Sequence, residues 1–125
     1  MSSATHVDLV VRADAQLARL VRMTAANVGM LSSMSVERIE DIKMAAEEAF
    51  IYACGSAAGS QLAIGFDATE DELAMTFTLE LDGFPEPADE DPAADYAELL
   101  MAAVCDSFEK RSAPAALVLR LKADI

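Results

Sequence analysis

The sequence has very few of the side chains from which transition-metal sites are built. Its only histidine is His6, and its two cysteines, Cys54 and Cys105, lie far apart and form no Cys-x-x-Cys pair. Zinc and copper sites need several histidine or cysteine ligands at close spacing. We therefore expect no metal site of that type, and we expect both thiols to be reduced core residues on apolar helix faces.

Basic side chains are scarce as well. The chain has 22 acidic residues against 9 lysines and arginines, a formal charge of -13, and no basic residue between Lys43 and Lys110. This charge repels phosphate backbones and anionic lipids, so nucleic acid and membrane are not expected as partners. The first residues show no basic start or apolar run, and no apolar stretch could cross a bilayer, which predicts a cytoplasmic protein.

Aliphatic side chains, in contrast, are abundant. Hydrophobic residues make up 54% of the 125 residues, with only five phenylalanines, two tyrosines and no tryptophan. A chain of this length and composition is expected to form a single domain, residues 1–125, around one aliphatic core.

The hydrophobic periodicity predicts an α+β protein. A period of two predicts strands at residues 7–12, 61–67, 72–81 and 117–122, the middle two forming a hairpin. Helical spacing after the N-cap residues Asp14 and Ser35, and again later, predicts helices at residues 14–29, 35–55 and 96–108. The order βααββαβ is typical of a two-layer sandwich with helices on one face of a mostly antiparallel sheet.

Two details of this prediction concern the helix faces and one long connection. The apolar stripes of the first two helices are expected to include Leu20, Leu31 and Val36, with Arg19 and Arg22 on the opposite face of the first helix. Residues 82–95 hold three of the four prolines and are predicted to be a loop.

The predicted second helix contains the most informative pattern. Its sequence from Ile39 to Cys54, IEDIKMAAEEAFIYAC, resembles the segment that carries the N-box motif, Glu-x-x-x-Asn, in the anti-sigma factor serine kinases of the GHKL superfamily. Residues 96–106 resemble the helix that follows the ATP lid of that family, and residues 115–122 resemble its closing strand. The resemblance implies a histidine kinase-like ATPase fold.

The resemblance also implies roles for particular residues. Glu48 falls at the general-base glutamate and Tyr52 at the asparagine that orients magnesium. A phenol is a poor ligand for a hard cation, which argues against magnesium binding here. Asp82 and Gly83 stand where the family has its adenine-binding aspartate and glycine, but the second glycine is missing and no glycine follows Gly83. We interpret these positions as vestiges of a nucleotide pocket.

The charge of the lid segment leads to the same interpretation. Five acidic residues, Glu86, Asp89, Glu90, Asp91 and Asp95, stand where the family closes a glycine-rich lid over the phosphates, with no cation in that segment. Each acid near a phosphate would cost up to about 1 kcal/mol even in water. No cofactor is therefore expected, and the Tyr52 ring is expected to plug the cavity with its hydroxyl on water or a backbone group. The acidic loop itself is either a solvated connection or a docking surface for a basic partner.

Three functional hypotheses follow. The first is a degenerate anti-sigma-factor-like regulator that acts by protein binding and is not an enzyme; the resemblance implies a sigma factor or its antagonist as partner, and a possible homodimer. The second is an active serine protein kinase that uses ATP, magnesium and Glu48. The third is a small-ligand sensor that uses the former pocket around Tyr52 and Phe84.

Overall fold

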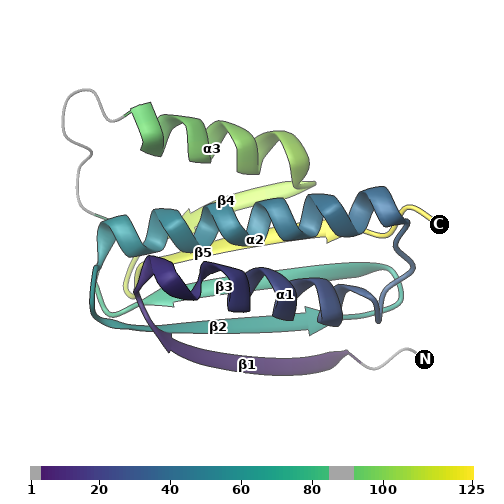
Figure 1. Cartoon of the computed structure of the whole chain (residues 1–125), viewed down its shortest axis with the longest axis horizontal. Coiled ribbons are helices and arrows are strands. Elements are labelled where there is room, and N and C mark those ends of the chain that lie inside the picture. The colour runs from purple at the N-terminus through teal and green to yellow at the C-terminus, as the bar shows by residue number, and fades with distance from the viewer. Residues whose placement is uncertain (1–3, 85–91) are drawn as a thin grey trace.

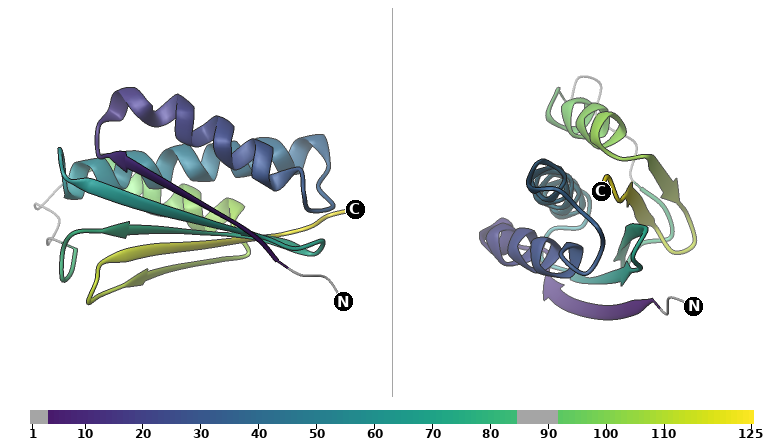
Figure 2. Two further views of the ribbon diagram at one scale, coloured as in Figure 1. Left: turned by 90° about the horizontal axis from the view of Figure 1, so that it is seen from below. Right: turned by 90° about the vertical axis from the view of Figure 1, so that its right-hand side faces the viewer.

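The computed structural model describes residues 4–84 and 92–125, and within them five strands and three α-helices form two layers (Figures 1 and 2). The elements in chain order are β1 (Thr5–Arg12), the 3₁₀ turn η1 (Ala15–Leu17), α1 (Ala18–Gly29), α2 (Val36–Ser56), β2 (Gln61–Ala68), β3 (Glu72–Leu79), α3 (Pro92–Val104), β4 (Ser107–Arg111) and β5 (Ala116–Lys122). The predicted α+β sandwich, with its helices on one face of the sheet, is confirmed.

The strands form one antiparallel sheet in the order β1-β2-β3-β5-β4. The predicted hairpin is present as β2 and β3, where Ile64 lies opposite Phe77 and Phe66 opposite Met75. β1 and β4 are the two edges of the sheet, and α1, α2 and α3 lie in that order from the β1 side to the β4 side (Figure 2).

The core lies between the sheet and α2. Alternate side chains of β2, β3 and β5 point toward the helices because successive residues of a strand face opposite sides. Alanines line the inner face of α2, which lets its backbone approach the sheet closely. The buried side chains of these elements include Ile42, Ala46, Ala49, Phe50, Ala53, Leu62, Ile64, Phe66, Leu73, Met75, Phe77, Leu79, Leu117, Leu119 and Leu121.

The predicted cap Ser35 begins α2, whereas Asp14 caps the 3₁₀ turn η1 and α1 itself begins at Ala18 without a side-chain cap. The Asp14 carboxylate accepts a hydrogen bond from the Gln16 amide at 3.0 Å, and the Ser35 hydroxyl accepts one from the Arg38 amide at 3.1 Å. Such side chains satisfy amides that the first turn of a helix leaves without an intrahelical partner. None of the helices in residues 4–84 and 92–125 is long and apolar enough to cross a membrane.

One strand was missing from the sequence prediction. The predicted helix 96–108 ends at Val104, and Phe108 lies in β4, which pairs with β5 as the edge of the sheet. β4 contains one apolar residue in five, so it carries too little alternation to be recognised as a strand. Its pairing with β5 is a tertiary contact, and that contact makes it a strand.

The predicted loop 82–95 was wrong at its end. α3 begins at Pro92, so residues 92–95 are helical. Proline is favoured in the first turn of a helix, because its fixed φ suits the helix and its missing amide would have no intrahelical partner there. The remainder of the predicted loop, including Glu86, Asp89, Glu90 and Asp91, lies largely outside the described residues.

The predicted helix faces also need correction. Leu20, Leu31 and Val36 are 48%, 56% and 77% exposed and lie outside the core. Arg22 is half-buried at the contact with α2, where its Nη1 atom lies 3.6 Å from Oε2 of Glu47. The exposure of these side chains and the burial of Arg22 depend on how α1 packs on α2. This packing does not follow from the periodicity of either helix.

Arg38 connects four elements at one end of the sandwich. From the first turn of α2, it donates hydrogen bonds to the carbonyl of Lys122 at the end of β5 (2.9 Å) and to that of Val104 at the end of α3 (3.0 Å). Its guanidinium also pairs with Asp41 and with Asp106, which directly precedes β4. The side chain is 14% exposed, so this charge is largely withdrawn from water and fully paired.

Candidate functional site

Tyr52 lies at the centre of a polar cluster built by four separate segments. Its hydroxyl donates a hydrogen bond to Oε1 of Glu98 on α3 (3.2 Å) and accepts one from Nζ of Lys110 on β4 (2.9 Å). Lys110 also donates to Glu98 at 2.8 Å. The ring of Phe84, which follows β3, meets the Tyr52 ring edge-on with centroids 5.8 Å apart. We call these four residues the Tyr52 cluster.

The lysine of the Tyr52 cluster stands against both aromatic rings. Its Nζ atom lies 5.4 Å from the ring centre of Tyr52 and 5.2 Å from that of Phe84. Burial is the largest single effect on the pKa of Lys110 and lowers it, but the hydrogen bonds to Glu98 and Tyr52 outweigh it and leave the pKa raised. The amine therefore stays protonated at neutral pH and forms a charged, partly shielded pair with Glu98.

The expectation for the Tyr52 hydroxyl was wrong. We expected it on water or a backbone group, but it bonds to two charged side chains, although the ring does pack against the core as expected. Sequence reasoning missed Lys110 and Glu98, since their meeting requires β4 to be the edge strand beside α3.

Glu48 lies one turn before Tyr52 on α2 and is half-buried. Burial, and secondarily the charge of Glu47, raise the pKa of its carboxyl group. Within the residues that the structure describes, Glu48 forms no hydrogen bond or ion pair. Its carboxyl group is therefore more basic than that of a fully exposed glutamate.

Asp82 and Gly83 lie against the turn between β4 and β5. The carbonyl of Asp82 accepts a hydrogen bond from the amide of Ala113 at 2.7 Å, and a Cβ atom on Gly83 would lie 3.8 Å from Oγ of Ser112. Both residues are exposed. In the described part of the chain no hydrogen bond or ion pair joins the side chains of Glu48, Tyr52 and Asp82, so the predicted pocket residues do not form one bonded site.

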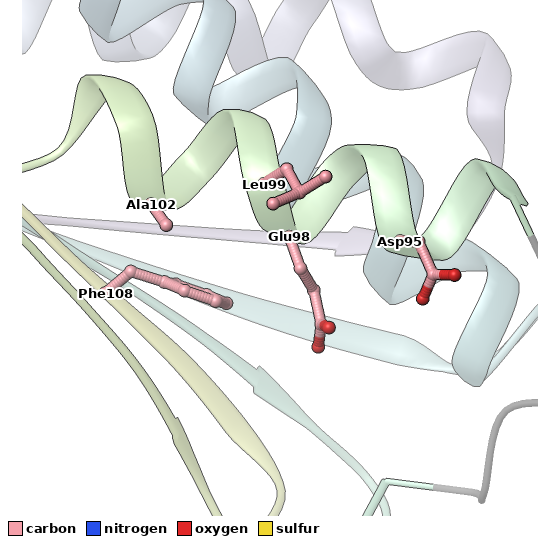
Figure 3. Close-up of a pocket in the computed structure, with 5 residues that line it drawn as sticks. All are labelled: Asp95, Glu98, Leu99, Ala102 and Phe108. Carbon is pink, nitrogen blue, oxygen red and sulfur yellow. The ribbon is translucent and has the colours of Figure 1, made fainter.

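A separate hollow lies between α3 and β4 (Figure 3). Its volume is about 570 Å³ and its lining consists of Asp95, Glu98, Leu99, Ala102 and Phe108. Leu99 is 70% exposed, so the wall on the α3 side is an apolar side chain in contact with water. Glu98 belongs both to this hollow and to the Tyr52 cluster, so the two adjoin at this carboxylate.

Possible ligands for a metal are not gathered in the described residues. Across residues 4–84 and 92–125, no group of three histidine, cysteine or carboxylate side chains is arranged to hold an ion. His6 contacts two carboxylates, Asp67 through Nδ1 at 2.6 Å and Asp8 through Nε2 at 2.8 Å, and both of its ring nitrogens are therefore engaged. Cys54 and Cys105 are free and buried; Cys54 lies on α2 as expected, whereas Cys105 follows the end of α3 and is not on a helix face.

No protein-family model matches this chain, and no curated protein matches its sequence. Two observations therefore bear on function, namely the resemblance of residues 39–54 and the geometry of the Tyr52 cluster.

Proposed function

We propose that this protein is a regulator of the anti-sigma factor type that acts by binding another protein and has lost nucleotide binding. The observation that carries the proposal is the Tyr52 cluster. At the position where the resembling kinases have the magnesium-orienting asparagine, this chain has an aromatic ring whose hydroxyl is committed to a lysine–glutamate pair.

The cluster disfavours a nucleotide for two physical reasons. Magnesium at this helix turn would need an oxygen ligand free to bind it, and the Tyr52 hydroxyl already bonds to Lys110 and Glu98. A triphosphate would also have to approach Glu98 and Asp95 on α3, while the nearest cation, Lys110, is neutralised by Glu98. The side chains of Tyr52 and Phe84 contact each other directly, which equally disfavours the small-ligand sensor.

Binding of a protein is supported by the hollow between α3 and β4. Two apolar side chains of α3, Tyr96 and Leu99, are 61% and 70% exposed. The acidic side chains of Asp95 and Glu98 lie among the residues that line the hollow. Apolar anchors with a polar rim are the usual composition of a protein interface. The charge of this rim fits a partner segment that carries apolar and basic side chains.

Calorimetric titration with ATP and magnesium tests the loss of nucleotide binding. We expect no saturable heat and no thermal stabilisation, whereas a ligand at a hundredfold excess over its Kd would stabilise the fold by about 2.7 kcal/mol. The variant Tyr52→Asn restores the motif of the resembling kinases, and we expect it also to fail, because the glycines of the lid are absent. Micromolar binding by the wild type, with phosphate transfer that Glu48→Ala abolishes, would establish the kinase instead.

Titration with individual purified sigma factors and anti-sigma antagonists from the source organism tests the partner. We expect one of them to bind, and we expect Leu99→Asp to weaken that binding. Val36→Asp, which adds the same charge at a 77% exposed position at the start of α2, serves as the control and should leave the affinity unchanged. Binding that neither variant alters would assign the contact to another face, and no binding by any of these proteins would refute this partner class.

A further inference from the structure

The two edges of the sheet differ sharply in how they are protected from other strands. β4 is five residues long and carries Glu109, Lys110 and Arg111 in succession, which is a common way of preventing edge-to-edge pairing. β1 is eight residues long, contains no proline or lysine, and pairs only with β2 in the described residues. Its outer row of backbone donors and acceptors is therefore free to bind another strand.

The open face of β1 has a charge pattern that complements itself. Asp8, Val10 and Arg12 alternate with Leu9 and Val11, so they share the sheet face that carries no helix. Val10 is 56% exposed there. When two such strands run antiparallel about a two-fold axis at Val10, each Asp8 lies directly opposite an Arg12 of the other strand.

We propose that the β1 edge binds the β1 edge of a second copy of this chain, antiparallel and centred on Val10, which joins the two sheets into one. In this register Val10 meets Val10, and Leu9 meets Val11 on the helix side. Side chains that are directly opposite lie about 4.5–5.5 Å apart at Cβ, close enough for both Asp8–Arg12 ion pairs. This dimer does not depend on the proposed function.

The charges select this register over its neighbours. If one strand were shifted by a single residue, its apolar, helix-side side chains would lie beside the outward side chains of the other strand. Centring on Asp8 would oppose two aspartates, centring on Leu9 would place Asp8 opposite Val10, and centring on Val11 would place Arg12 opposite Val10. Of these four registers, the one centred on Val10 alone pairs each Asp8 with an Arg12.

α1 supplies additional apolar surface beside the same edge. α1 lies over the β1 end of the sheet (Figure 2), and its Arg22 faces α2 through the contact with Glu47. Leu20, two residues earlier, lies on nearly the opposite side of the helix and is 48% exposed. A stable interface buries roughly 800 Å² on each partner, more than one strand supplies, and the outward face of α1 would contribute the remainder.

Sedimentation equilibrium of the full chain and of charge-reversal variants tests the surface and the register together. We expect the wild type to sediment at twice the chain mass of 13.3 kDa. Asp8→Arg and Arg12→Asp should each weaken the dimer by about tenfold or more, because each places two pairs of like charges in contact. An equimolar mixture of the two variants should dimerise again, since both charge pairs across the mixed dimer then join opposite signs.

Matched controls come from the protected edge, where Glu109→Arg and Arg111→Asp change the net charge by the same amounts. Both should dimerise like the wild type, and circular dichroism should show that all four variants are folded. A wild type that stays monomeric, or a dimer that the Asp8 and Arg12 changes leave intact, would refute the β1 surface. If the single variants dissociate and their equimolar mixture does not dimerise again, the register is refuted.

Discussion

Replacing Arg38 by methionine should be one of the most damaging single changes to this protein. The side chain is 14% exposed, and its guanidinium bonds to two backbone carbonyls, of Val104 and Lys122, and pairs with Asp41 and Asp106. Methionine would fill much of the space but would leave all four acceptors without this donor. The ends of α3 and β5 and the start of β4 would lose their common connection.

The expected cost can be worked from these contacts. Breaking a buried ion pair on one side typically costs about 3–5 kcal/mol, because the remaining charge is left unpaired. Asp41 and Asp106 are each 37% exposed, so water can partly replace the guanidinium and the lower end of that range applies. We therefore expect a loss of about 3 kcal/mol in the free energy of unfolding, which lowers Tm by about 10 °C for a chain of this length.

Urea denaturation and differential scanning calorimetry measure this loss. Arg111→Met is the matched control, because Arg111 also makes two hydrogen bonds to one carboxylate, Glu109, but is 53% exposed. That variant should leave Tm almost unchanged, since exposed ion pairs contribute little. Arg38→Lys should recover only part of the loss, because an ammonium cannot reproduce the fork of donors. Equal small effects at Arg38 and Arg111 would refute the reasoning.

Three further outcomes are expected. Burial raises the pKa of the Cys105 thiol to about 12. Ellman's reagent should therefore not label Cys105 in the native protein at pH 8 and should label it fully in urea, whereas rapid labelling of native Cys105 would contradict this burial. Hydrogen bonds to two aspartates raise the pKa of His6, so the stability that His6→Asn removes should be present below the ordinary pKa of 6.5 and disappear as pH rises through the folded value; urea midpoints at pH 5.5 and 9 that differ equally from the wild type would contradict it. Phe66 is fully buried, so Phe66→Ala should lower the free energy of unfolding in urea by about 3–5 kcal/mol, and Phe66→Leu should lower it much less. Equal losses for the two variants would contradict this, because they would show that the core collapses around the cavity left by alanine.

The elements that could be predicted are those whose signals are local. The caps Asp14 and Ser35 and the alternation of β2 and β3 are signals carried by neighbouring residues, and the structure has these elements nearly where they were predicted. β4 has no such signal, because its conformation is imposed by pairing with β5. The same holds for the exposed Leu20, whose helix was correctly predicted and whose burial was not.

The candidate site divides in the same way. Tyr52 and Glu48 were singled out because the resemblance lies in one continuous segment of sequence, in which their positions are one helical turn apart. Lys110 and Glu98 could not be singled out, since they reach Tyr52 only after α3 packs on α2 and β4 joins the edge of the sheet. The α+β class, the helix caps, the hairpin and the acidic character follow from the amino-acid sequence, because each depends on composition or on residues a few positions apart. Which charges meet, which helix faces stay exposed and which strand edge is left open follow from the packing of the elements, because these features depend on contacts between segments that are distant in the chain.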